Sequence, residues 1–236
     1  MLKILSYNIE WGRKVDEAGE WIMNLNPAPD IICLQEIPQN KVPSLKKSFE
    51  NHGYDCKYAP AYTDHEIVYG ELTAYNTKKV TLVFSKVVEL GSSIVARLVS
   101  QHNSRYTSLL TVFKHKNKTF IIINIHLLPF VLNGKRRKQL GIAIEALTLL
   151  RYINIASLIV GDYNYSSLIG RKGLIKFMAT HGFSIGGKKK VITHKKWRIK
   201  HQTDYVFYRH CTVKNLLSEK VKFSDHYPIF FNLELD

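Results

Sequence analysis

Six short polar motifs lie where apolar, strand-like runs begin or end, and their side chains are of the kinds that bind metals and move protons. In chain order they are SYNIEW with Asn8, LQE with Glu36, NIHL with His126, GDYN with Asp162 and Asn164, QTDYVF with Asp204, and SDHYP with Asp225 and His226. Apolar runs such as FIIINIHL and SLIVGDYN are typical of buried strands. Because strand ends meet at the rim of a sheet, the pattern predicts a metal-dependent active site assembled from distant segments.

Asn8 and Glu36 predict a site for Mg²⁺ or Mn²⁺. A hard divalent cation prefers oxygen ligands, and a phosphate and waters would complete its octahedron. Asp225 adds a further carboxylate, either as a metal ligand or beside the metal. Taken alone, Asn8 or Glu36 is also consistent with a helix cap or a turn residue.

The GDYN and SDHYP motifs supply groups for acid–base chemistry. In an extended segment Asp162 and Asn164 would point the same way, so Asp162 could activate a water while Asn164 donates to a phosphoryl oxygen. The alternative for this motif is an Asx-turn. His226 provides an imidazole that titrates near neutral pH, and Asp204 is the candidate that orients it through the other ring nitrogen.

His126 has two interpretations. It ends the most hydrophobic run, either as a catalytic residue partnered by Glu71 of YGELTAYN, or as a core histidine satisfied by its neighbours. The other histidines share no spacing and are interpreted as surface residues: His52, His65, His102, His115, His181, His194, His201 and His210.

The chain is strongly basic, which favours a polyanionic partner. Its 236 residues include 34 Lys+Arg and 19 Asp+Glu, a net charge of +15. Nucleic acid is the simplest partner, an anionic membrane surface is second, and a proteome that is basic throughout is the unspecific alternative. The segment 186–202, called here the basic segment, precedes Asp204 directly. It predicts contacts to phosphates and to an unstacked base from Lys188, Lys189, Lys190, Lys195, Lys196, Trp197 and Arg198.

A second basic run, GKRRK at 134–138, makes Arg137 a candidate phosphate contact. The alternative is a solvated first helical turn, since basic residues there oppose the helix dipole. The three cysteines have no zinc spacing and predict neither a disulfide framework nor a disulfide-linked partner. With no signal peptide and no apolar run of about 20 residues, we expect a cytoplasmic protein without stable membrane insertion.

Periodicity predicts helices from Val15, from Val42, from Gly134 and around 171–181, with a strand meander over 54–125. The final PIFFNLEL alternates like a strand with one buried face. No linker or repeat interrupts the chain, so we expect one catalytic domain over 1–236. Strands with helices early and late favour an α/β fold in which two packed sheets are covered outside by helices.

The motif order N…E…H…GDxN…DY…SDH resembles the endonuclease/exonuclease/phosphatase superfamily of metal-dependent phosphoesterases, from Ser6 to about Leu235. The resemblance implies a four-layer α/β/β/α sandwich of two mixed sheets. NIHLLP is similar to the branch with pancreatic-type deoxyribonucleases, tyrosyl-DNA phosphodiesterases, deadenylases and sphingomyelinases. Some of that branch pair the histidine with a glutamate near the Glu71 position. One departure is Gln202-Thr203, where the family often has an arginine before I-D-Y.

We therefore expect a Mg²⁺- or Mn²⁺-dependent phosphodiesterase that hydrolyses DNA or RNA. One alternative is a lipid or inositol phosphoesterase at an anionic membrane, against which no amphipathic or aromatic docking segment stands out in the sequence. The other is an inactive nucleic-acid-binding module, against which all six motifs are complete.

Overall fold

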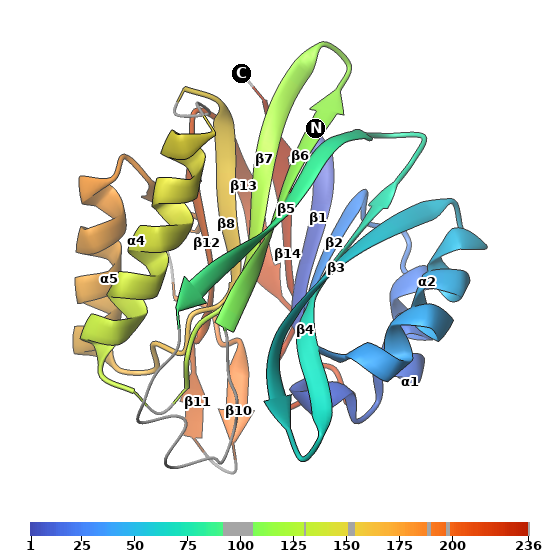
Figure 1. Ribbon diagram of the computed structural model, residues 1–236, viewed down its shortest axis with the longest axis horizontal. Coiled ribbons are helices and arrows are strands. Elements are labelled where there is room, and N and C mark those ends of the chain that lie inside the picture. Colours follow the sequence, from blue (N-terminus) through green and yellow to red (C-terminus); the bar gives the residue numbers. More distant parts are fainter. Residues whose placement is uncertain (92–105, 130, 151–153, 188–189, 197–198, 236) are drawn as a thin grey trace.

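Two six-stranded mixed sheets pack face to face and carry helices on their outer surfaces (Figure 1). The computed structural model describes residues 1–236 except 92–105, 130, 151–153, 188–189, 197–198 and 236. The strand orders are β13-β14-β1-β2-β4-β3 in the first sheet and β5-β6-β7-β8-β12-β9 in the second. This arrangement confirms the expected α/β sandwich.

The first sheet consists of β1 (Leu2–Asn8), β2 (Ile31–Pro38), β3 (Tyr54–Asp64), β4 (Ile67–Asn76), β13 (Thr212–Ser218) and β14 (Ile229–Glu234). The second consists of β5 (Thr81–Gly91), β6 (Tyr106–His115), β7 (Lys118–His126), β8 (Ala156–Asp162), β9 (Ser184–Ile185) and β12 (Asp204–Arg209). A separate hairpin pairs β10 (His194–Lys196) with β11 (Ile199–His201). The helices are α1 (Val15–Met23), α2 (Val42–Glu50), α4 (Asn133–Leu149) and α5 (Leu168–Thr180), with 3₁₀ turns η1 (Glu10–Gly12) and η2 (Gln39–Lys41).

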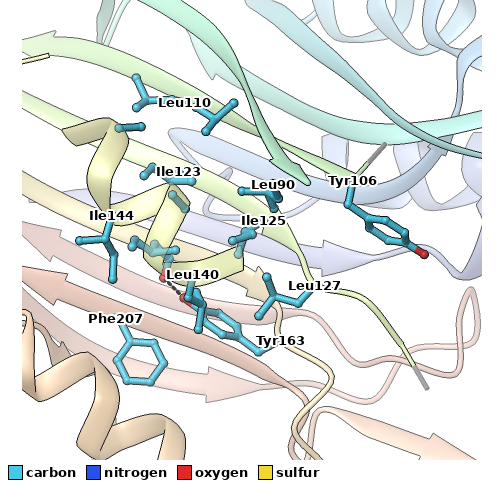
Figure 2. Packing of buried hydrophobic residues seen from close by; sticks show 14 of the residues in the cluster. Leu90, Tyr106, Leu110, Ile123, Ile125, Leu127, Leu140, Ile144, Tyr163 and Phe207 are labelled. Atoms are coloured by element: carbon cyan, nitrogen blue, oxygen red, sulfur yellow. Dashed lines mark hydrogen bonds between the residues drawn. The ribbon is translucent and has the colours of Figure 1, made fainter. Parts of the chain in front are cut away.

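Three apolar clusters hold the four layers together. The middle cluster lies between the sheets and includes Ile4 from β1 and Ile122 from β7. A second joins α1 and α2 to the outer face of the first sheet, and a third joins α4 and α5 to the outer face of the second. Figure 2 shows Leu140 and Ile144 of α4 over the side chains of that sheet. The layers therefore run helix, sheet, sheet, helix.

Strand β7 shows how one sequence run serves two of these clusters. Successive side chains point to opposite faces of a strand. Ile121, Ile123 and Ile125 pack toward α4, whereas Phe120 and Ile122 pack between the sheets. All are fully buried, so the apolar run FIIINI, interrupted only by Asn124, is the signature of a strand covered on both faces.

A polar contact joins the two sheets near the end of this run. The Gln35 side chain of β2 donates to Asn124 Oδ1 of β7 at 2.7 Å, and the Asn124 amide donates to the Leu34 and Leu72 carbonyls. These buried hydrogen bonds fix the relative position of the sheets at the edge where the polar motifs lie.

Within the described residues the predicted helices and strands are confirmed, with modest differences in their ends. The helix expected around 171–181 begins earlier, at Leu168, because Ser167 caps it by accepting a hydrogen bond from the Gly170 amide. Residues 92–105 of the strand meander expected over 54–125 lie outside the described residues. All three cysteines are buried. Among the described helices, none has both the length and the apolar character to cross a membrane.

Candidate functional site

Strand pairing accounts for the positions of five of the six motifs at one edge of the sandwich. β1 and β2 run parallel, so Asn8 pairs with Gln35, next to Glu36. β7 and β8 also run parallel, so His126 pairs with Asp162. β12 runs antiparallel to β8 and begins where β8 ends, which places Asp204 opposite Asp162. The hairpin of β10 and β11 projects from this same edge, and both chain termini lie toward the opposite one (Figure 1).

Glu36 sits in a strained turn that aims its carboxylate into the cluster. It has a φ of +60°, in a β-bulge of β2 between Leu34 and Ile37. Such a conformation is costly for a glutamate and tends to persist where it serves a site. The Trp11 amide donates to Glu36 Oε2 at 2.7 Å, and the Asn8 side chain donates to Glu36 Oε1 at 3.0 Å. Burial raises the pKa of Glu36, and the Asn8 hydrogen bond opposes that shift.

Asn8 joins the two halves of the site. Its amide nitrogen also donates to Asp162 Oδ2 at 3.1 Å, while its oxygen accepts from the Glu10 amide at 3.1 Å. The side chain is fully buried. Asn8 therefore holds a carboxylate of the first sheet beside a carboxylate of the second.

Asp162 depends on a close approach of β7 and β8. A Cβ on Gly161, where φ is +141°, would lie 1.9 Å from the Ile125 carbonyl oxygen. Only glycine fits there. Burial raises the pKa of Asp162, and the negative charge of Asp204 adds to the shift.

The expectation that Asp162 and Asn164 share an extended segment is wrong. Asn164 has a φ of +54°, and its amide donates to Asp162 Oδ1 at 2.8 Å, which is the Asx-turn alternative. The turn nevertheless directs the Asn164 side chain into the site. It donates to the Leu127 carbonyl at 2.9 Å and lies 3.2 Å from His126 Nε2.

His126 is a buried histidine within the polar cluster. Its Nε2 lies 3.6 Å from Glu36 Oε1 and 3.7 Å from Asp162 Oδ2. The ring centroids of Tyr62 and Tyr106 lie 6.0 and 6.4 Å from that of His126, in T-shaped arrangements. Burial lowers the pKa of His126, although the charge of Asp162 opposes that shift.

Glu71 does not form the hydrogen bond to His126 that the sequence suggested. Its Oε2 accepts from Thr107 Oγ1 at 3.3 Å. Within the described part of the chain, Glu71 Oε1 and His126 Nδ1 are both buried and lack a hydrogen-bond partner. Burial raises the pKa of Glu71 well above its ordinary value, and the Glu36 charge contributes in the same direction.

Asp204 and His226 form the predicted pair. His226 Nδ1 and Asp204 Oδ2 are 2.9 Å apart, and the Thr203 hydroxyl also donates to that oxygen at 2.8 Å. The other ring nitrogen, Nε2, lies 3.7 Å from Asp162 Oδ2. Burial lowers the pKa of His226, but the charges of Asp204, Asp162 and Asp225 outweigh burial and raise the pKa to about 10. The imidazole is therefore cationic at neutral pH.

The serine of SDHYP anchors this histidine to β1. Ser224 Oγ donates to the Asn8 carbonyl at 2.8 Å and accepts from the His226 amide at 3.0 Å. Asp225 lies near the other nitrogen of this ring, with its Oδ1 3.9 Å from His226 Nε2. The motif thus attaches the end of the chain to both sheets.

Sequence reasoning missed His194 and placed it on the surface. Its side chain is 16% exposed, its Nε2 lies 3.3 Å from Asp225 Oδ2, and its ring centroid lies 4.6 Å from that of His226. Its position within the basic segment, close to Asp204 in sequence, was the one available signal. That position does not reveal that Asp225 and His226, more than thirty residues away in the chain, are its neighbours.

The predicted substrate-binding residues are only partly accounted for. Lys190 is exposed, and Lys195 is half-buried with its backbone amide donating to the Asp225 carbonyl at 2.9 Å. Arg137 is exposed on α4. Its neighbour Arg136 is buried and donates to the Leu128 carbonyl at 2.8 Å. Lys188, Lys189, Trp197 and Arg198 lie outside the described residues, as does the side chain of Lys196.

The donor set at this edge suits a hard divalent cation. Glu36 and Asp162 are carboxylates whose pKa values are raised by burial, so an added positive charge would stabilise their ionised forms. Oxygen donors of this kind are what Mg²⁺ and Mn²⁺ prefer. A further group of potential ligands comprises Asp162, Asp204 and His226.

Comparison with known proteins identifies the fold. No protein-family model matches the sequence, and no curated protein sequence does. An endonuclease/exonuclease/phosphatase from Bacteroides vulgatus superposes with a TM-score of 0.78 at 18% identity, covering 100% of this chain and 99% of that one.

Two other solved structures also superpose on nearly the whole chain. ANGEL2, a 2′,3′-cyclic phosphatase, gives a TM-score of 0.76 at 16% identity, covering 99% of this chain and 95% of that one. D. rerio TDP2 complexed with a single-strand DNA product gives 0.74 at 16% identity, with 99% and 98% covered. These likenesses, together with the layers and strand order described above, confirm the predicted resemblance: the chain has the fold of the endonuclease/exonuclease/phosphatase superfamily.

Proposed function

We propose that the protein is a divalent-metal-dependent phosphodiesterase that hydrolyses nucleic acid. One observation carries the proposal: Glu36, Asp162 and the Asp204–His226 pair converge at one buried edge, with His226 Nε2 3.7 Å from Asp162. Carboxylates for a metal and a positioned imidazole are the groups that phosphodiester hydrolysis needs.

The metal would be held by Glu36 and Asn8, with Asp225 nearby. When bound, Mg²⁺ or Mn²⁺ would neutralise charge on the phosphoryl oxygens during in-line displacement. The strained Glu36 turn and the Trp11 amide would keep that carboxylate in place before any substrate arrives. Such preorganisation avoids a reorganisation cost during the reaction.

Asp162 and His226 would divide the proton transfers. Asp162, with its raised pKa, suits the base that orients and deprotonates the attacking water. His226, cationic and fixed through Nδ1 by Asp204, suits the acid that gives a proton from Nε2 to the leaving oxygen. Asn164 would donate a hydrogen bond to a non-bridging oxygen, and His126 would keep it in position.

The substrate assignment rests on charge and on the relatives. A net charge of +15 favours a polyanion, and the basic segment runs from Gly186 to Gln202 beside Asp204. Lys195 of that segment is tied by its backbone to Asp225. D. rerio TDP2 was solved with a single-strand DNA product, which supports the same substrate class here.

A lipid phosphoesterase is the second candidate, because one exposed apolar group lies near the site. Leu132 and Ile169 are 84% and 86% exposed. Leu132 immediately precedes α4, and Ile169 lies in the first turn of α5. Tyr165, just before α5, donates through Oη to the carbonyl of Asn133, the first residue of α4, at 3.0 Å. Aliphatic side chains beside basic helices are typical of surfaces that touch anionic lipid.

One assay separates these functions. Purified protein with Mg²⁺ is given single- and double-stranded DNA, RNA, and phosphoinositide vesicles, each with and without EDTA. We expect cleavage of nucleic acid that EDTA abolishes and Mg²⁺ or Mn²⁺ restores. Hydrolysis of the vesicles alone would replace our proposal with the lipid function, and no hydrolysis of any substrate would favour the inactive binding module.

A further inference from the structure

A second group of potential metal ligands consists of His194, Asp225 and His226. His194 begins β10 and forms an isolated backbone bridge with His226. The Tyr227 amide donates to the Thr193 carbonyl at 2.6 Å, and the Lys195 amide donates to the Asp225 carbonyl at 2.9 Å. These backbone contacts fix the hairpin against the SDHYP motif and hold the two imidazole rings 4.6 Å apart.

The donor atoms of this group have the spacing of a metal site. His194 Nε2 lies 3.3 Å from Asp225 Oδ2, and His226 Nε2 lies 3.9 Å from Asp225 Oδ1. One ligand atom from each of the three residues lies within 4.8 Å of the others. In a tetrahedral zinc site with bonds of about 2.1 Å, neighbouring donors are roughly 3.4 Å apart. A small inward movement of the side chains would complete the coordination.

The chemistry of this group differs from that of the Glu36 site. Two imidazole nitrogens and one carboxylate favour Zn²⁺ and similar transition metals, whereas Mg²⁺ prefers oxygen alone. His226 is already oriented by a carboxylate through Nδ1, the arrangement that supports histidine ligands in zinc proteins. The negative charge around His226 also favours a bound cation. Within the described residues, Asp162 and Asp204 form ion pairs with histidines, and lysine and arginine side chains do not neutralise them.

We propose that His194, Asp225 and His226 form a transition-metal site, distinct from the Mg²⁺ site at Glu36 and Asn8 although Asp225 lies beside both, and that Zn²⁺ bound there inhibits hydrolysis. Binding would engage the Nε2 atom of His226, the atom assigned to proton transfer, and would release to solvent the proton that this nitrogen otherwise carries. The inhibitory part rests on the proposed function, whereas the binding part depends only on the three ligands. His194 then determines whether the protein responds to zinc and takes no part in the Mg²⁺-dependent reaction.

The test compares two histidines that face each other across the hairpin. His194 and His201 are cross-strand partners, but only His194 belongs to the three-ligand group. Zn²⁺ affinity is measured without substrate, in excess Mg²⁺, by competition with a chromophoric chelator. We expect one Zn²⁺ per wild-type chain, an affinity at least ~10-fold weaker in His194→Gln, and no change in His201→Gln.

Activity and spectroscopy complete the test. Zn²⁺ should inhibit the wild type and His201→Gln, while His194→Gln keeps its Mg²⁺-dependent rate and needs at least ~10-fold more Zn²⁺ for inhibition. Co²⁺ bound to the wild type should give the strong visible absorption of a four- or five-coordinate ion, which Zn²⁺ removes and excess Mg²⁺ does not. This readout needs no variant, should His194→Gln fail to fold.

The contrary results are equally specific. Equal Zn²⁺ affinity in wild type and His194→Gln, or weak six-coordinate Co²⁺ absorption, overturns the site. Zn²⁺ binding that leaves hydrolysis unaffected overturns the inhibition. A protein that binds Zn²⁺ through His194 but cleaves no phosphodiester keeps the site and removes the proposed function, so the two failures are distinguishable.

Discussion

His226 has the environment of a functional histidine because a buried ring is surrounded by carboxylates. Asp204 lies 2.9 Å from Nδ1, and Asp162 lies 3.7 Å from Nε2. Neither partner was adjacent in sequence, yet the residue types predicted the Asp204–His226 pair. Because Asp204 holds the ring through Nδ1, Nε2 remains available for proton transfer.

Replacing either member of this pair should slow catalysis while leaving the fold intact. We expect His226→Ala to lower kcat by at least ~10²-fold, the lower range for losing general acid–base help. Asp204→Asn should lower kcat as well, because it removes the charge that orients the ring. His201→Ala is the matched control and should retain activity. Wild-type turnover in His226→Ala, with an unchanged circular dichroism spectrum, would refute the assigned role.

Glu71 should make stability depend on pH. Because its folded pKa is raised by burial, its contribution is full below the unfolded pKa of about 4.3 and is lost as pH rises through the folded value. Glu71→Gln keeps the shape and removes the ionisation. Urea unfolding should therefore show the variant gaining stability relative to wild type as pH increases from 5 to about 9. An identical pH dependence in both proteins would contradict the account.

At the scale of elements, the motifs were recognisable because each lies beside a strand whose apolar pattern is strong. Parallel pairing of β7 with β8 follows from such runs, since both are buried on both faces. Local turn geometry was not predictable in the same way. The left-handed conformations of Glu36 and Asn164 arise from a bulge and an Asx-turn that tertiary contacts stabilise. The position of His194 depends on a hairpin docking against a distant motif, which no local pattern encodes.

The junction of β7 and β8 provides an element-level test. Gly161→Ala would force a Cβ to within 1.9 Å of the Ile125 carbonyl oxygen, so the strands must separate and His126 must move away from Asp162. We expect strong destabilisation, several kcal/mol, and loss of activity.

Gly173→Ala in α5 is the control, because nothing lies within 4 Å of its added Cβ. It should leave activity unchanged and stabilise the helix by about 0.5–1 kcal/mol in thermal unfolding. A Gly161→Ala variant as stable as wild type would be inconsistent with this packing.

At the scale of the whole molecule, excess positive charge should govern substrate affinity. Replacing Lys188, Lys189, Lys190, Lys195 and Lys196 with Ser should raise KM for nucleic acid and flatten its salt dependence, by a slope of about 0.7 for each single-strand phosphate that the variant no longer neutralises. Cleavage of a small chromogenic phosphodiester should change far less. The control replaces exposed lysines with the same total charge at the far ends of the strands: Lys78, Lys79, Lys114, Lys116 and Lys118. Equal effects of the two sets would show that only net charge matters.

The central claim is that this buried polar edge hydrolyses phosphodiester bonds in nucleic acid with a divalent metal. The most direct measurement is the initial cleavage rate of a labelled single-stranded oligonucleotide by wild type and by Asp162→Asn, each after chelation and after stepwise addition of Mg²⁺. We predict that the wild-type rate is abolished by chelation and restored by Mg²⁺, and that Asp162→Asn is at least ~10²-fold slower at saturating Mg²⁺. Cleavage that survives chelation, or that proceeds equally fast in Asp162→Asn, would contradict the account.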